Sequence, residues 1–228
     1  MGPGQERLAA NLQALEERIG RACARAGRER DSVRLIAVTK THPAQTIQSL
    51  IDIGVRHIGE NRVQEIEEKA PLLHGDFTLH MVGHLQTNKV GRLLPHVKWI
   101  QSIDSERLVS RIEFCRKDGP KIRALVEVNT SGEASKSGCL PQECHRLAER
   151  VAASATLEFR GFMTIGPLNA NEKQVRESFA LLRSLGESCR GLAQALELSM
   201  GMSGDFEWAI EEGSTMIRVG TALMGERR

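Results

Sequence analysis

The clearest signal of the fold is one apolar run, Val33-Arg34-Leu35-Ile36-Ala37-Val38-Thr39-Lys40, which Thr41-His42-Pro43 follows. A short aliphatic, β-branched run that a turn signal bounds is typical of a buried parallel strand. Proline is favoured in a first helical turn, so we expect a helix to begin at Pro43. Lys40 therefore stands where a strand gives way to a helix. Ligands of α/β proteins bind at that edge, although a strand-end lysine can also simply extend into solvent.

The rest of the chain repeats this alternation of strand and helix patterns. Strands are expected at 33–40, 56–60, 78–83, 96–101, 122–128, 159–165, 196–200 and 215–219, with helical patterns between them. Another helix is expected at 5–26, where Leu8, Leu12, Leu15, Ile19, Ala22 and Ala26 form one apolar stripe. This order predicts an α/β fold, a single (β/α)8 barrel domain over residues 1–228. An open doubly wound sheet is the alternative.

The C-terminal end of the pattern is incomplete for a barrel. Only residues 220–228 follow the last expected strand, too few for a full helix on the outer ring. We therefore expect the helix at 5–26 to occupy the missing position.

Composition narrows the class of protein. Of 228 residues, 40% are hydrophobic and 26% charged, and the net charge is +2, which describes a soluble globular protein. There is no block of like charges for nucleic acid, no apolar stretch near the ~18 residues of a membrane helix, and no signal-peptide core. The 5 cysteines are scattered and form no C-x-x-C motif, which predicts reduced thiols in the cytoplasm and no metal site.

Two glycine-containing stretches follow the last two expected strands. They are Ser199-Met200-Gly201-Met202-Ser203-Gly204-Asp205 and Arg218-Val219-Gly220-Thr221. Glycines let backbone N–H groups approach an anion closely, and the loops after strands seven and eight are the common phosphate site of this fold. Ordinary tight turns also contain glycine, so the position of both loops matters more than their composition.

A lysine opposite a phosphate site suggests an aldehyde cofactor. Desolvation disfavours the ammonium form of a buried amine, which can then attack a carbonyl. Pyridoxal phosphate fits both ends, with its aldehyde on Lys40 and its phosphate on the two loops. A metal-dependent or phosphosugar enzyme on the same barrel is the alternative without the Schiff base.

Several stretches resemble the pyridoxal phosphate homeostasis protein family. They are Ala37-Val38-Thr39-Lys40, Ile58-Gly59-Glu60-Asn61-Arg62-Val63-Gln64-Glu65, His80-Met81-Val82-Gly83-His84-Leu85-Gln86-Thr87-Asn88-Lys89, Val128-Asn129-Thr130-Ser131-Gly132-Glu133, Arg160-Gly161-Phe162-Met163-Thr164, the two glycine-containing stretches and Gly213-Ser214-Thr215. The resemblance spans about residues 30–225. It implies a fold similar to the barrel domain of alanine racemase, fold type III of the pyridoxal phosphate proteins.

The resemblance also implies the roles of individual residues. Lys40 is the implied Schiff-base lysine, and Arg218 is placed near the pyridine nitrogen, where a cation keeps that nitrogen unprotonated. Asn61 and Met163 line the pocket. The implied phosphate ligands are Ser203, Gly204, Gly220 and Thr221.

The chain departs from the racemase in one informative respect. It contains 0 tyrosines, whereas alanine racemase takes its second base from a tyrosine of a second domain. His80, His84 or Lys89 are possible substitutes, but such residues are more often structural. We therefore expect a carrier that buffers or delivers pyridoxal phosphate and has no catalytic residue, with a small amino-acid racemase or lyase as the alternative.

The expected partners follow from that role. They are pyridoxal phosphate, amino acids and pyridoxal-phosphate-dependent apo-enzymes, and the protein is expected to be a monomer or a weak dimer. Lys136, after the fifth strand, is either a rim lysine that assists cofactor uptake and release or a surface lysine bonded to a carboxylate such as Glu133.

Overall fold

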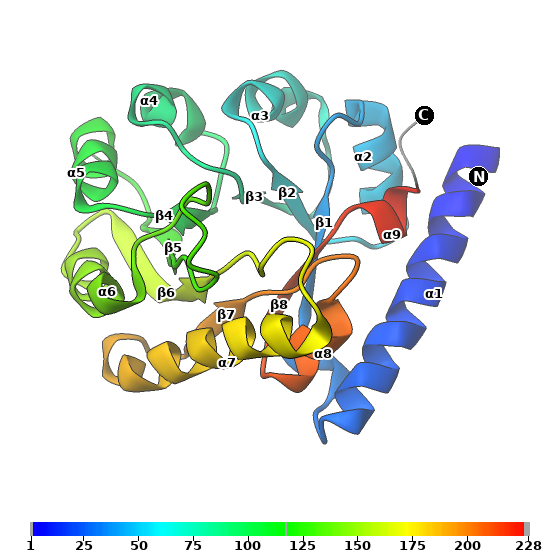
Figure 1. The fold of residues 1–228 in the computed structure, drawn as a ribbon. Coiled ribbons are helices and arrows are strands. Elements are labelled where there is room, and N and C mark those ends of the chain that lie inside the picture. Colours follow the sequence, from blue (N-terminus) through cyan, green and yellow to red (C-terminus); the bar gives the residue numbers. More distant parts are fainter. Residues whose placement is uncertain (1, 117, 226–228) are drawn as a thin grey trace.

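The computed structural model describes residues 2–116 and 118–225, which form a closed barrel of eight parallel strands with helices around it (Figure 1). The strands follow each other around the barrel in chain order, and β8 closes the ring by pairing with β1. This confirms the predicted (β/α)8 barrel and excludes the open sheet.

The strands are β1 (Arg34–Val38), β2 (His57–Glu60), β3 (Thr78–Met81), β4 (Trp99–Ile103), β5 (Ile122–Glu127), β6 (Leu157–Met163), β7 (Glu197–Ser199) and β8 (Met216–Val219). The helices are α1 (Pro3–Arg25), α2 (Ala44–Asp52), α3 (Val63–Lys69), α4 (Val90–Leu93), α5 (Glu106–Cys115), α6 (Cys144–Ala152), α7 (Glu172–Ser188), α8 (Phe206–Glu211) and α9 (Thr221–Met224).

Two strands are displaced from their expected positions. β4 was expected at 96–101 but begins at Trp99, because the His96 N–H bonds the Leu93 carbonyl (3.0 Å) and prolongs the turn after α4. β6 was expected at 159–165 but begins at Leu157, which pairs with Ile122 at the start of β5. A local turn thus sets the start of β4, and pairing with a distant strand sets the start of β6.

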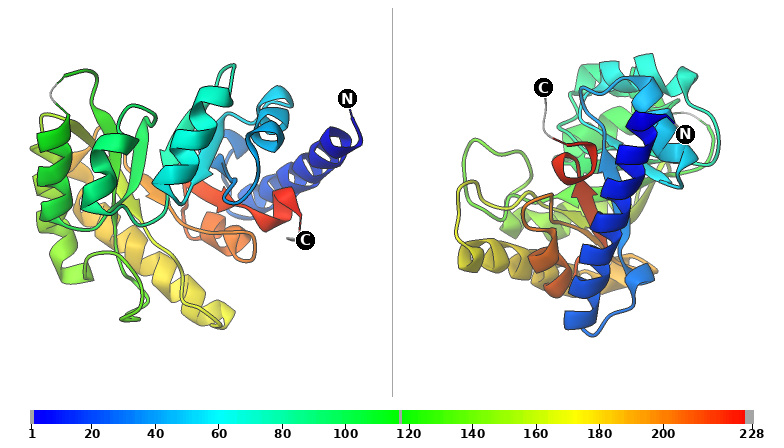
Figure 2. Two further views of the ribbon diagram at one scale, coloured as in Figure 1. Left: turned by 90° about the horizontal axis from the view of Figure 1, so that it is seen from above. Right: turned by 90° about the vertical axis from the view of Figure 1, so that its right-hand side faces the viewer.

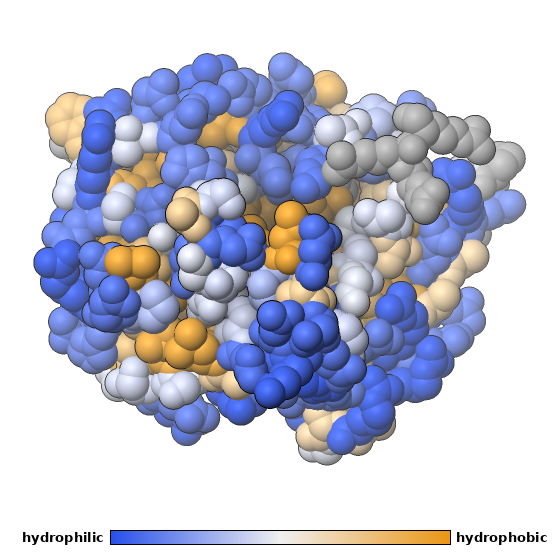
Figure 3. Space-filling model, viewed as in Figure 1, coloured by the Kyte–Doolittle hydropathy of each residue, from blue (hydrophilic) through white to orange (hydrophobic). Residues whose placement is uncertain are grey.

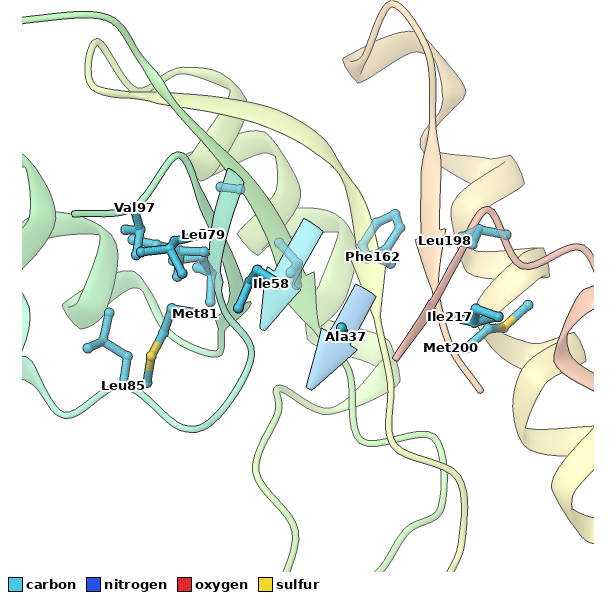
Figure 4. Close-up of a cluster of buried hydrophobic side chains, with 14 of the residues drawn as sticks. Ala37, Ile58, Leu79, Met81, Leu85, Val97, Phe162, Leu198, Met200 and Ile217 are labelled. Carbon is cyan, nitrogen blue, oxygen red and sulfur yellow. The ribbon is translucent and has the colours of Figure 1, made fainter. Parts of the chain in front are cut away.

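Strand side chains alternate between two apolar regions. Outward-facing residues such as Ala37, Phe162 and Ile217 lie in the large core between barrel and helices (Figure 4). The inward-facing Ile36, Trp99, Leu125, Met163 and Met216 form a separate cluster inside the barrel. Burying one such side chain stabilises the fold by about 1.5–3 kcal/mol. The cluster fills the described interior of the barrel with apolar side chains.

Helix α1 closes the outer ring. It lies along one side of the molecule and contacts α2 and α8, the neighbours of a full helix after β8, as well as the short α9 that follows β8 (Figure 2). Leu15 and Ile19 on its inner face are buried, and Arg18 binds both carboxylate oxygens of Glu207 at 3.1 and 3.2 Å. The expected position of this helix is confirmed.

The surface is mainly hydrophilic in the view of Figure 3, with apolar side chains in small separate patches. Ile165 and Met202 are among the exposed apolar residues. Across the described part of the chain, no helix combines the length and the apolar character needed to cross a bilayer. All five cysteines are free thiols.

Candidate ligand-binding site

A cavity of about 520 Å³ lies at the carboxyl ends of the strands. All but one of the residues expected to bind the cofactor line it: Lys40, Asn61, Ser203, Gly204, Arg218, Gly220 and Thr221. They come from the segments after β1, β2 and β7 and from the end of β8. The barrel therefore brings the lysine, the arginine and both glycine-containing loops to one cavity.

Met163 is the exception. Its side chain is fully buried in the interior cluster with Trp99, Leu125 and Met216, and it is not among the described residues that line the cavity. As the last residue of β6 it faces inward, so it supports the cavity from within the barrel.

The backbone on the N-terminal side of Lys40 is held by a buried ion pair. Lys69 Nζ, at the end of α3, contacts Glu60 Oε1 at 2.9 Å. The Thr39 hydroxyl donates to the same oxygen at 2.7 Å, and Lys69 Nζ also donates to the Thr39 carbonyl at 3.3 Å. Burial raises the pKa of Glu60 despite these hydrogen bonds, so the carboxyl depends on its partners. The residue before Lys40 is thereby fixed to β2 and α3.

Lys69 also supports the backbone on the C-terminal side of Lys40, through Glu65. Lys69 Nζ contacts Glu65 Oε2 at 2.6 Å, and that oxygen accepts the Thr41 N–H at 2.7 Å. Thr41 has a positive φ of 68°, a conformation that needs such external support in a residue other than glycine. Neither Lys69 nor Glu65 is among the cofactor-binding residues expected from the sequence, where their i,i+4 spacing on one helix is a signal for the pair.

Asn61 is positioned by a close backbone approach. A Cβ on Gly83, after β3, would lie 2.4 Å from the Asn61 carbonyl oxygen, so only glycine fits there. This contact presses the segment after β2 against the segment after β3. Both Asn61 and Gly83 line the cavity as a result.

The two glycine-containing loops are joined to each other. The Arg218 N–H donates to the Gly201 carbonyl at 3.0 Å. Ser203 Oγ accepts the N–H groups of Gly220 and Ala222 at 3.3 and 3.2 Å. A serine hydroxyl and backbone N–H groups thus converge at one wall of the cavity, as a phosphate site requires.

Arg218 is a buried cation at the base of the cavity. It is 5% exposed, and its guanidinium donates to Ser199 Oγ and to the Thr164 carbonyl, both at 2.7 Å. Burial lowers the pKa of Arg218 to about 10, which still leaves it charged at neutral pH. Its two hydrogen bonds fix the direction of the charge.

A chain of hydrogen bonds continues from Arg218 into the barrel. Ser199 Oγ donates to Gln101 Oε1 at 2.7 Å, and Gln101 Nε2 lies 3.0 Å from His80 Nδ1. His80 Nε2 in turn lies 3.1 Å from His57 Nδ1. Burial lowers the pKa of His57 to about 4 and that of His80 well below its usual value, so both rings are neutral. His80 is therefore a structural group of the interior.

The other candidate bases differ in their surroundings. His84 lines the cavity, is exposed and contacts Asp104 Oδ2 at 3.2 Å. Lys89 is not among the described residues that line it. Lys136 lines it, and its Nζ contacts Glu133 Oε1 at 2.8 Å and the Gly166 carbonyl at 2.6 Å, so the predicted bond to Glu133 is present.

One further residue of the cavity was missed from the sequence. Glu127, the last residue of β5, lines the cavity with Lys40 and Arg218 and is 4% exposed. The signal for it was the alternation of the strand, because Leu125 faces inward and Glu127 is two residues further along. Among the described residues, no group of three or more histidine, cysteine or acidic side chains is placed to hold a metal ion.

The comparisons first define a class of protein. The family described as alanine racemase, N-terminal domain, matches residues 10–228. The barrel is similar to alanine racemase from Corynebacterium glutamicum, with a TM-score of 0.75 and 15% identity over 97% of this chain and 61% of that chain. The fold is thus that of the alanine racemase N-terminal domain.

Closer relatives define the family. The chain is 40% identical over 227 residues to a pyridoxal phosphate homeostasis protein of Vibrio cholerae, covering 95% of each. It is 39% identical to the human protein of that name, over 95% of this chain and 85% of that protein. It is also similar to PipY of Synechococcus elongatus with PLP bound, with a TM-score of 0.84 and 33% identity over 96% of this chain and 100% of that chain. The chain belongs to the pyridoxal phosphate homeostasis protein family.

Proposed function

We propose that this protein binds pyridoxal phosphate in the cavity and takes part in its intracellular homeostasis, by buffering the cofactor or delivering it. The observation that carries the proposal is the single cavity that Lys40, Arg218 and both glycine-containing loops share. The names of the relatives and the pyridoxal phosphate bound to PipY support it.

The residues of the cavity fit this cofactor in charge and type. Pyridoxal phosphate supplies an aldehyde that bonds reversibly to amines. In the proposal, Lys40 holds the aldehyde as a Schiff base, Arg218 lies beside the pyridine nitrogen and Asn61 lines the pocket, with Met163 packed beneath it. The phosphate is bound by Ser203, Gly204, Gly220 and Thr221.

The proposal assigns no robust catalytic turnover to the site. The chain has 0 tyrosines, so the usual second base is lacking. The neutral His80 is turned into the barrel interior. We propose pyridoxal-phosphate-dependent apo-enzymes as recipients and amino acids as further ligands. Three expectations stay predictions: that the chain is a single domain, that the protein is cytoplasmic, and that it is a monomer or a weak dimer.

The cofactor assignment is tested with the purified protein. We expect a visible absorption band after addition of pyridoxal phosphate, and borohydride reduction should leave a pyridoxyl phosphate group on Lys40, located by peptide mass spectrometry. Lys40→Ala should lose both signals at an unchanged unfolding temperature, and Lys89→Ala, outside the cavity, should keep them. A stoichiometric band in Lys40→Ala would refute the assignment of this lysine.

The carrier role is tested separately. The loaded protein is incubated with L-amino acids, and racemised or eliminated products are measured by chiral chromatography. We expect no product above the level that free pyridoxal phosphate gives. Turnover at ordinary enzymatic rates would favour the racemase or lyase alternative.

A further inference from the structure

Glu127 lies at the carboxyl end of the barrel interior, as the last residue of β5. Its side chain follows Leu125 on the inward face of β5 and is 4% exposed. Its backbone carbonyl accepts the Cys139 N–H at 2.9 Å, which ties the strand end to the loop that follows. The carboxyl group is one of the groups that line the cavity.

The carboxyl group of Glu127 lacks a partner that buried polar groups normally have. Its Oε2 is buried and has no hydrogen-bond partner among the described residues. Most buried polar atoms in proteins are hydrogen-bonded, and an unpaired one destabilises the fold. Because Glu127 lines a ligand cavity, a bound molecule can supply the missing partner.

The charges around Glu127 do not offset the effect of burial, which disfavours the ionised carboxylate. Asp104, after β4, disfavours its ionised form and Arg218, on β8, favours it. Among the described residues, the other ionisable side chains that line the cavity are Lys40, His84 and Lys136, and Cys139 contacts Glu127 through its backbone N–H. Burial dominates and raises the pKa of Glu127 to about 7. Around neutral pH this carboxyl group is therefore partly protonated, unlike an ordinary carboxylate.

We propose that Glu127 contacts the bound ligand as a neutral carboxylic acid, so that ligand binding takes up a proton from solvent at this residue. An anionic ligand removes water from the cavity and adds negative charge, and both effects favour the protonated carboxyl. The acid O–H then donates a hydrogen bond to an acceptor of the ligand. The inference rests on the proposed function, since the ligand is pyridoxal phosphate.

Proton uptake makes the affinity depend on pH. The share of binding due to Glu127 weakens as the pH rises above about 7, by at most about tenfold per pH unit for one proton. A glutamine at this position donates an N–H at any pH. Glu127→Gln should therefore bind the ligand more tightly than the parent at pH 8.5 and about equally at pH 6.

The test measures protons directly. Pyridoxine 5′-phosphate, which has a hydroxymethyl group in place of the aldehyde, is titrated into each protein in a calorimeter at pH 8. Two buffers with different heats of ionisation give the number of protons bound. We expect the parent to take up close to one proton more than Glu127→Gln, and Glu177→Gln, exposed on α7, to match the parent.

Two measurements keep the outcomes distinct. An infrared difference spectrum of the parent should gain a protonated-carboxyl band on binding at pH 8, a readout that requires no variant. Equal proton uptake in parent and Glu127→Gln, or no such band, would overturn the role of Glu127 while ligand binding persists. Failure of pyridoxal phosphate itself to bind the parent would overturn the proposed function and this inference with it.

Discussion

At the scale of one residue, Glu127 occupies a position where a neutral amide would fill the same space. Its pKa is about 7 in the folded protein, against a usual value of 4.5. Below pH 4.5 both the folded and the unfolded state carry the proton, so the ionisation of Glu127 does not lower the stability there. As the pH rises from 4.5 to 7, Glu127 ionises in the unfolded chain but stays largely protonated in the folded protein, which lowers the free energy of unfolding.

The expected result is a loss of stability of about 3 kcal/mol from this residue between pH 4.5 and pH 7, and no further loss above. Glu127→Gln should remove that loss. Urea unfolding of parent and variant at pH 5 and pH 8 measures it, because the variant should gain on the parent only at the higher pH. An equal difference at both pH values would contradict the burial argument.

Two hydroxyl groups at the glycine-containing loops are expected to hold the phosphate. Ser203→Ala and Thr221→Val should each weaken cofactor binding by roughly 1.5–3 kcal/mol, the value of a hydrogen bond to a charged group. The absorption maximum of the bound fraction should stay the same, because Lys40 is unaffected. Equilibrium dialysis gives the affinities, with Ser188→Ala at the distant end of α7 as the control. Unchanged affinity in both variants would place the phosphate elsewhere.

At the scale of elements, the segment after β1 depends on α3. Lys69 supports both neighbours of Lys40, through Glu60 on one side and Glu65 on the other. Lys69→Met should destabilise the protein by about 3–5 kcal/mol, because Glu60 is left buried without its cation. It should also slow the reaction of Lys40 with pyridoxal phosphate, measured by stopped-flow absorbance.

A second variant separates stability from positioning. Lys69→Met combined with Glu60→Gln removes the buried charge and should recover most of the stability. The reaction of Lys40 should stay slow, because Thr41 still lacks its support from the Lys69–Glu65 pair. Lys89→Met is the matched control on a neighbouring loop. Full recovery of the rate in the double variant would show that Lys69 acts on stability alone.

At the scale of the whole molecule, α1 completes the ring of helices, and none of its described residues lines the cavity. Ile19 is fully buried on the inner face of α1. Replacing it with alanine should lower the free energy of unfolding by about 2–5 kcal/mol. Gln13→Ala, on the exposed face, should change stability by less than about 0.5 kcal/mol. Urea unfolding measures both, and cofactor affinity should be unchanged in each. A loss of affinity in Ile19→Ala would indicate that α1 is coupled to the cavity.

Local patterns were sufficient for the architecture and for part of the site. The alternation of strands and helices, the position of Lys40 at the end of β1 and the glycines after β7 and β8 are properties of short stretches. In a barrel of parallel strands, the carboxyl ends of all strands lie at the same end of the barrel. The residues that follow the strands therefore meet around one cavity, whatever the details of packing. Pattern and resemblance thus predicted the barrel, and seven of the eight residues expected to bind the cofactor line the cavity.

The remaining features depend on contacts between distant parts of the chain. Met163 was assigned to the pocket but packs in the interior cluster, and Glu127 was overlooked although it faces the cavity. Both residues face the barrel interior and are paired across β5 and β6, so the alternation of one strand does not decide which of them lines the cavity; packing inside the closed barrel does. The same holds for Lys69, whose partners are brought together only when α3 packs beside β1 and β2. The acid–base properties of these groups follow from burial, which exists only in the folded chain.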